Sequence, residues 1–183
     1  PFGNLFHTGD WKFDPDPVIG PVSDIDALRR IGEEGVLALI GDSTNVFVPG
    51  TSGSEASLLG NLTDLIQGCT GRVAVTCFAS NVARLKTIFH AASANGRAVS
   101  LVGRSLWRID GAARETGYLT DLPKFIESEA TRDIPKDQIL YIFTGSQGEP
   151  RAALARIAAV DHRFVSMEEG DTVIFSSRII PGN

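Results

Sequence analysis

The stretch FHTGDWKFD, residues 6–14, combines a histidine, two aspartates and a lysine within nine positions. Imidazole and carboxylate groups are ligands that Zn²⁺ takes in proteins, so the stretch contains suitable ligand types for part of a metal site. A zinc site takes three or four protein ligands, and the other two histidines, His90 and His162, lie far away in the sequence. The stretch alone therefore supplies too few ligands for a zinc site, and whether it binds a metal depends on the ligands that other elements bring to it.

Five short apolar runs rich in β-branched residues predict strands at 36–40, 72–78, 97–102, 138–143 and 172–176. The runs are apolar almost throughout, which is typical of parallel strands that helices cover on both faces. Helical periods lie between them at 58–66, behind a possible capping box of Ser52 and Glu55, at 82–92 before Gly96, and after Pro150. Residues 162–175 predict two strands around a glycine turn. The pattern predicts an α/β fold, a doubly wound, mostly parallel sheet with helices on both faces.

Small residues with hydroxyl or amide groups follow all five runs. The loops are GDSTN at 41–45, ASN at 79–81, GRS at 103–105, TGSQGE at 144–149 and SSR at 176–178. Ligands of an open parallel sheet bind outside the carboxyl ends of the strands, and backbone N–H groups of such turns hold anionic oxygens. Ser, Gly and Asn are also common in any turn, but five such loops on one edge favour a phosphate-rich ligand.

The composition excludes several classes of protein. A net charge of −5 argues against a broadly basic nucleic-acid-binding protein. It does not exclude a local positive groove, because Arg84, Arg104, Arg151 and Arg178 fall near the loops. No apolar run approaches the roughly 20 residues of a membrane span. The two cysteines, Cys69 and Cys77, lack metal or disulfide spacing and are expected to be buried, reduced thiols of a cytoplasmic protein. No nucleophile elbow, CxxC pair or Walker-type phosphate loop is present in the sequence.

Six motifs occur in order: HTGDWKFD, GDSTN, FASNVAR, VGRS, TGSQGEP and SSRIIPGN. Together they resemble the ribonuclease J family, nucleases of the metallo-β-lactamase fold with an inserted β-CASP domain of Rossmann-like architecture. The resemblance implies a zinc-dependent RNA phosphodiesterase, a 5′–3′ exonuclease or endonuclease of RNA processing and decay. In such sites a carboxylate bridges two zinc ions, and a metal-bound hydroxide attacks phosphorus.

The resemblance also implies roles for individual residues. Asp10 matches the metal-bridging aspartate, and Asp42 matches an acidic motif that partners a catalytic histidine. Ser80, Asn81 and Val82 match a loop that contacts the substrate nucleotide. The remaining strand-end loops add the expected substrate-binding residues Arg104, Ser105, Ser146, Gln147, Ser176 and Arg178. Without the resemblance, Asp10 reads as a turn residue and Asp42 as a cap of the following segment.

The chain departs from the family pattern in its metal ligands. The histidine clusters of the family are absent, and Asp10 is the one implied ligand that the chain supplies. We therefore expect a fragment, with residues 1–22 as the closing edge of a metallo-β-lactamase domain and 23–183 as most of the β-CASP domain. The parent is expected to hold the pair of zinc ions, to bind single-stranded, 5′-monophosphorylated RNA and to form a homo-oligomer, without contact to a membrane.

Two other functions fit parts of the pattern. TGSQGEP resembles the phosphate loop of sugar-phosphate isomerase domains, which share the doubly wound scheme, but HTGD and the proline-rich lead-in are not needed there. The segment could also be a non-catalytic module that clamps RNA or mediates dimerisation.

The ligand count gives a first prediction. We expect the isolated 183-residue chain to lose added zinc on dialysis against a weak chelator, because one carboxylate without imidazole partners does not dehydrate the ion. Metal analysis after dialysis measures this, and stoichiometric zinc in the retained protein would contradict it.

Overall fold

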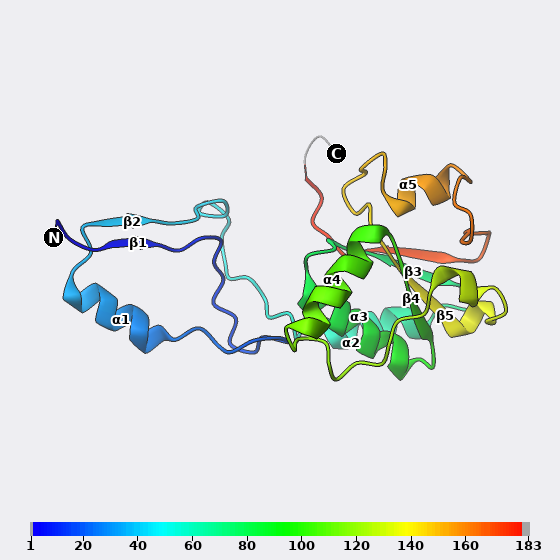
Figure 1. The fold of residues 1–183 in the computed structure, drawn as a ribbon, viewed down its shortest axis with the longest axis horizontal. Helices are drawn as coiled ribbons and strands as arrows, with labels where there is room; N and C mark the ends of the chain where they lie inside the picture. Colours follow the sequence, from blue (N-terminus) through cyan, green and yellow to red (C-terminus); the bar gives the residue numbers. More distant parts are fainter. Residues whose placement is uncertain (1, 181–183) are drawn as a thin grey trace.

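The computed structural model describes residues 2–180 and contains two parallel sheets (Figure 1). The larger sheet has four strands in the order β4-β5-β3-β6. Their bounds are β3 (Val73–Thr76), β4 (Ala98–Val102), β5 (Ile139–Phe143) and β6 (Thr172–Phe175). All neighbouring pairs are parallel, with Val73 opposite both Leu140 and Thr172. Four of the five apolar runs therefore form the predicted sheet.

Helices and short segments cover both faces of this sheet. One face carries α2 (Leu58–Gln67), α3 (Val82–Ala94) and α4 (Arg104–Glu115). The other face carries α5 (Ala153–Ala158) and Val165, packed on Tyr141 and Phe143. Two 3₁₀ helices, η1 (Ser128–Thr131) and η2 (Lys136–Gln138), lead into β5. The architecture confirms the α/β prediction.

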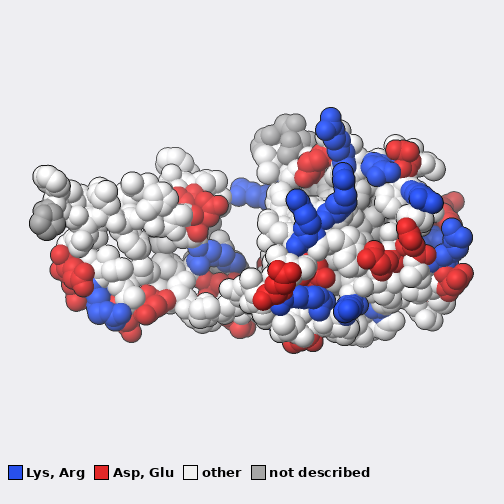
Figure 2. Space-filling view, in the orientation of Figure 1, with Lys and Arg blue, Asp and Glu red and all other residues white. Residues whose placement is uncertain are grey.

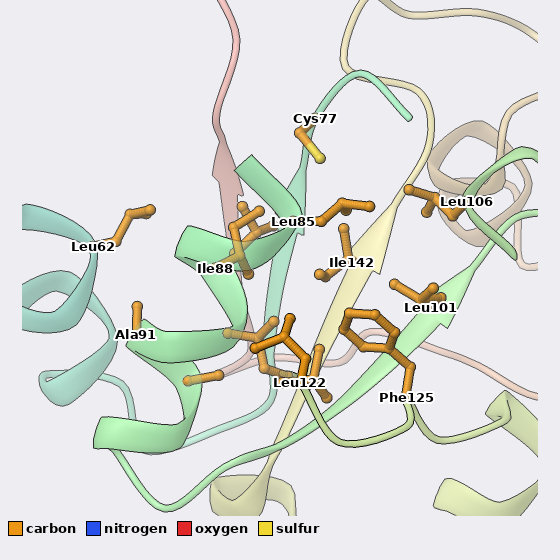
Figure 3. Close-up of a cluster of buried hydrophobic side chains, with 14 of the residues drawn as sticks. Leu62, Cys77, Leu85, Ile88, Ala91, Leu101, Leu106, Leu122, Phe125 and Ile142 are labelled. Atoms are coloured by element: carbon orange, nitrogen blue, oxygen red, sulfur yellow. The ribbon is translucent and has the colours of Figure 1, made fainter. Parts of the chain in front are cut away.

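The main core lies between the sheet and α2, α3 and α4 (Figure 3). Leu85 and Ile88 of α3 point toward Ile142 of β5, and Phe125 closes the cluster beside Leu101. Leu85, Ile88, Leu101 and Ile142 are fully buried. Fully burying one such aliphatic side chain contributes about 1.5–3 kcal/mol. The cluster therefore holds the strands of the main sheet in place, and with them the loops that follow the strands.

The apolar run at 36–40 was predicted for the same sheet, and this is wrong. Its strand β2 (Ala38–Ile40) pairs instead with β1 (Leu5–His7) in a separate two-stranded parallel sheet, with Leu5 opposite Ala38. The crossover between them contains α1 (Ile25–Glu34), which the apolar periods did not predict. No residue of β1, α1 or β2 is buried. The sheet assignment failed because apolar composition indicates that a strand needs covering but does not specify its partner strand. The proposed division at residue 22 stays a prediction, and the β1–β2 pairing crosses it.

Three further local predictions differ from the structure. The Ser52–Glu55 capping box is absent, since α2 begins at Leu58 and its first turn has no side-chain cap. Helix α4 begins inside the GRS segment that the sequence indicated as a loop. No strand forms at 163–168, where the N–H groups of Phe164 and Val165 approach Nδ1 of His162 in a local turn.

Arg84, in the first turn of α3, ties three segments together. Its guanidinium forms a bidentate ion pair with Glu55, with a second distance of 3.0 Å from Nη2 to Oε2, and it donates to the carbonyl and hydroxyl of Ser176 after β6. The two charged side chains are 15% and 13% exposed. The interaction therefore holds the lead-in to α2 and the end of β6 against α3.

Removing one partner of this pair should destabilise the protein strongly. Arg84→Met leaves Glu55 charged and largely buried, so we expect the free energy of unfolding to fall by about 3 kcal/mol. The double variant Glu55→Gln/Arg84→Met should recover part of this loss, because no unpaired charge remains. Arg29→Met is a matched control, since its ion pair with Asp26 is highly exposed and contributes less than about 1 kcal/mol. Urea denaturation measures all three, and equal losses for Arg84→Met and Arg29→Met would contradict the prediction.

Asp171 fixes the start of β6 beside the start of β3. Its carboxylate, only 2% exposed, accepts from the N–H groups of Arg72 at 2.7 Å and Glu168 at 2.9 Å and pairs with the Arg72 guanidinium at 3.1 Å. Burial alone would raise the pKa of Asp171, but these hydrogen bonds outweigh it and the pKa is lowered. Gly71 lies so close that a Cβ there would be 2.4 Å from the Gly170 carbonyl oxygen, so the backbone approach requires glycine.

The lowered pKa makes a pH-dependent prediction. Asp171→Asn should reduce the free energy of unfolding by about 2 kcal/mol at pH 7, because charge-assisted hydrogen bonds are lost. The contribution of a carboxyl with a lowered folded pKa is complete above its unfolded value of about 3.9 and disappears as the pH falls through the folded value. The difference between wild type and variant should therefore shrink only below about pH 4. Denaturation series at several pH values test this, with the exposed Asp133→Asn as control; a constant difference down to pH 2 would be the contrary result.

Candidate functional site

Four of the five polar loops lie on one edge of the main sheet. They follow β3, β4, β5 and β6, whose carboxyl ends share an edge because all four strands are parallel. The fifth loop, 41–45, follows β2, which belongs to the other sheet, so the prediction that this loop follows a strand of the main sheet is wrong. It still meets this edge, since Arg178 Nη1 donates to Asn45 Oδ1 at 3.0 Å.

Three of these loops follow the neighbouring strands β5, β3 and β6, and we call 79–81, 144–149 and 176–178 the junction loops. Ser177 Oγ donates to the Ser146 carbonyl at 3.2 Å, and Gln147 Nε2 donates to the Arg178 carbonyl at 3.0 Å. Ser176 receives the Arg84 guanidinium. The Ser146 hydroxyl is buried without a hydrogen-bond partner in the described part of the chain. The predicted residues Ser146, Gln147, Ser176 and Arg178 are thus brought together.

Asn81 begins α3 and has a structural role of its own. Its Oδ1 accepts from the Arg84 N–H at 3.0 Å as the helix cap, with its amide NH₂ left for another acceptor. Ser80 beside it is exposed. Val82 is the first helical residue and packs against the main core, which leaves Ser80 and Asn81 as the residues of this predicted loop with polar side chains.

Asp10 and Asp42 occupy neighbouring loops after β1 and β2. The Thr8 hydroxyl accepts from the Asp42 N–H at 3.2 Å, and the Trp11 indole donates to the Asp42 carbonyl at 3.1 Å. The hydroxyl and N–H of Thr44 both donate to Oδ1 of Asp42 and lower the pKa of that carboxyl, which stays ionised at neutral pH. Asp10 itself is exposed. The parallel β1–β2 pairing therefore brings the two predicted acidic residues to one edge.

The residues around Asp10 do not complete a metal site. Across residues 2–180 no group of three or more His, Cys, Asp or Glu side chains is placed to hold a metal ion. His7 Nδ1 accepts from the Gly9 N–H at 3.0 Å, so that nitrogen is engaged. The donor set described here does not fit zinc, and a zinc site would need ligands beyond it.

The two cysteines lie in different environments. Cys77 is buried at the end of β3, and burial raises the pKa of its thiol to about 12, which removes its nucleophilic thiolate at neutral pH. Cys69 is only partly buried. Both are free, and the expected burial is correct for Cys77 alone.

A hollow of about 890 Å³ opens beside the junction loops, between α4, the 149–153 segment and Phe164. We call it the arginine groove, because Arg104, Arg108, Arg151 and Arg156 all line it, with Glu149 as its one acidic side chain. The predicted residues Arg104 and Ser105 belong here and not to the junction loops. Arg108 and Arg156 were missed by sequence reasoning. The signal for Arg108 was its spacing of four from Arg104 on one helix, which required recognition of α4.

No helix within residues 2–180 combines the length and apolar character that crossing a bilayer requires.

Known proteins match the chain almost from end to end. A family model described as "Ribonuclease J, beta-CASP domain" matches residues 70–183. Ribonuclease J of Sinorhizobium meliloti is 48% identical over 181 residues, which is 99% of this chain and 32% of that protein. Ribonuclease J of Mycolicibacterium smegmatis is 46% identical over 99% of this chain and 33% of its own length. Ribonuclease J2 of Bacillus subtilis is 41% identical over 98% of this chain and 33% of its own length.

The chain thus spans about a third of the length of the curated relatives it matches. The matched family model covers the four-stranded sheet and all of its strand-end loops. The motifs from HTGD to SSRIIPGN, the parallel sheet and these matches agree, and the chain belongs to the ribonuclease J family.

Proposed function

We propose that the full-length protein hydrolyses RNA and that this chain supplies its substrate-binding β-CASP surface together with one metal ligand. The observation that carries the proposal is the position of the three junction loops at one edge of the sheet, where the 176–178 loop also contacts the 144–149 loop and Asn45. Family membership favours this reading over a sugar-phosphate isomerase module. A clamp without chemistry accounts for the same loops but gives Asp10 and Asp42 no role.

Neutral donors carry the recognition of RNA in this proposal. The Ser80 hydroxyl, the Asn81 amide and the Gln147 segment orient a phosphate or ribose without a large positive surface. Arg178 adds one charge at the same edge. This chemistry reconciles RNA binding with a net charge of −5. A 5′-monophosphorylated single strand is the substrate that suits an anion-binding edge of this kind.

Asp10 and Asp42 would serve a zinc centre of the full-length protein. Asp10 is the proposed metal ligand, and Asp42, ionised and oriented by Thr44, is the proposed hydrogen-bond partner of a histidine outside this chain. Zinc would polarise the phosphate and activate water there. The exposed apolar side chains of Leu5, Leu39 and Ile40 support our proposal that β1 and β2 belong to the edge of a larger metallo-β-lactamase domain.

We also propose a cytoplasmic protein that acts as a homo-oligomer. Two free cysteines suit a reducing compartment. Most soluble oligomers are homo-oligomers with closed symmetry. Exonuclease and endonuclease activity both remain part of the proposal, since the junction loops accept either an RNA end or an internal phosphate.

The amide of Asn81 is the sharpest test of the substrate loop. In the full-length protein we expect Asn81→Ala to lower kcat/KM on a 5′-monophosphorylated oligoribonucleotide about tenfold, since a hydrogen bond to a charged group contributes about 1.5–3 kcal/mol. Zinc content should stay unchanged, because the 79–81 loop contains no proposed zinc-binding residue. Steady-state kinetics and metal analysis of the same preparations provide the measurement.

Asn81→Ser is the matched control, because a serine keeps the helix cap but lacks the amide NH₂. A similar loss in both variants assigns the effect to the amide. Wild-type kinetics in both would remove the loop from the site, and loss of zinc together with activity would show that its role was misassigned.

A further inference from the structure

The arginine groove carries a positive charge that the rest of the molecule does not neutralise. Among residues 2–180, no ion pair or hydrogen bond engages the guanidinium groups of Arg104, Arg108 and Arg151, and all three are exposed. Arg156 approaches Asp161 at 3.7 Å, a pair that is largely exposed. Figure 2 shows Lys and Arg side chains gathered over α4 and beside α5. The positive charges that line the groove repel one another, so an anion that spans the groove would be bound favourably.

Aromatic rings lie between these charges. Trp107 and Phe164 line the groove, and both are only partly buried. The Trp107 indole donates to the Leu101 carbonyl at 3.1 Å, and the Arg163 guanidinium covers the Phe164 ring at 4.9 Å. His162 also lines the groove, and burial and the neighbouring Arg156 lower its pKa, so its ring is neutral at pH 7. Cationic side chains interleaved with aromatic rings are typical of surfaces that bind single-stranded nucleic acid.

The groove is continuous with the junction loops. Thr144 and Glu149 line the groove, while Ser146 and Gln147 between them make the junction contacts. Glu149 Oε2 accepts from the Gln147 N–H at 2.9 Å, which turns this acid toward its own loop. Thr144 and Gln147 are three positions apart in the chain, a distance of at most about 10 Å. A polymer that leaves the junction loops therefore meets the groove within a short distance.

We propose that the arginine groove binds the single-stranded RNA beyond the nucleotides held at the junction loops. The arginines contact successive backbone phosphates, and bases stack on the partly exposed rings. Such contacts do not depend on base identity, so the groove should lengthen the bound stretch of RNA without selecting its sequence. This inference rests on the proposed function and adds a separate contact surface to it.

RNA length separates the groove from the junction loops. The test uses the full-length protein and two hydrolysis-resistant 5′-phosphorylated 2′-O-methyl oligoribonucleotides, of about 3 and about 12 nucleotides, which bracket known single-strand site sizes. In the variant Arg108→Gln/Arg151→Gln we expect the dissociation constant of the longer strand to rise about tenfold or more, since two phosphate contacts are lost. The slope of log affinity against log salt should fall by about 1.4, because each contact on a single strand contributes about 0.7. Affinity for the short strand should stay unchanged.

Arg30→Gln is the matched control, an exposed arginine on α1 outside the groove. Arg108 and Arg151 have no partner among the described residues, so thermal denaturation should show all variants folded. Unchanged binding of the longer strand would contradict the proposed role of the groove in RNA binding. Equal weakening of binding for both strand lengths would contradict it as well. If the wild-type protein binds neither strand, the proposed function fails as well, which distinguishes the two failures.

Discussion

The ion pair of Arg84 with Glu55 is the interaction on which the candidate site depends most. It lies under the strand-end edge, where a single guanidinium satisfies a carboxylate and the carbonyl of Ser176 at once. Because both charges are largely buried, each requires the other to remain in place. The position of the 176–178 loop thus depends on this largely buried ion pair. Arg84 also donates its backbone N–H to Asn81, so the same residue sets the direction of the proposed substrate amide.

Two surfaces with different chemistry share this edge of the sheet. The junction loops offer hydroxyls, an amide and backbone groups, whereas the arginine groove offers exposed guanidinium groups and aromatic rings. Neutral donors provide geometry, and cations provide affinity that weakens with salt. The 144–149 loop joins the two, since its first and last residues line the groove and its middle contacts the 176–178 loop. An acidic protein can bind a polyanion in this way because its positive charge is local.

The sequence predicted the elements whose signals are local. The runs that became β3, β4 and β5 are almost entirely buried, so their apolar composition was informative, whereas β6 at the edge of the sheet is only partly buried. Helix α3 and its end before Gly96, with a φ of +67°, followed from the apolar period and the need for glycine there. The partner of β2 was not predictable, because three residues of β1 carry too little pattern. Glu55 looked like part of a cap, and only the tertiary fold shows that Arg84 competes for it successfully.

For the candidate site, the types of residue were predictable but their grouping was not. Parallel strands bring loops to one edge, which explains why the loops after β3, β5 and β6 meet. Arg104 and Ser105 follow β4 at one end of the sheet order, so they face α5 and the groove instead. Arg156 enters the groove from a helix far along the chain. Such placements depend on packing between distant segments, which spacing in one sequence does not encode.

The strand order has a consequence for how the chain reaches this fold. β3 pairs only with β5 and β6, and both are synthesised after it. One edge of the buried strand β3 therefore stays unpaired until β5 is made and the other until β6, and the hydrogen bonds between Arg72 and Asp171 that hold β6 there span 99 residues. Long-range pairing of this kind slows folding and leaves strand edges open to other chains. During translation, β3 is therefore the segment that most needs protection, and only completion of β6 removes the risk of misassembly.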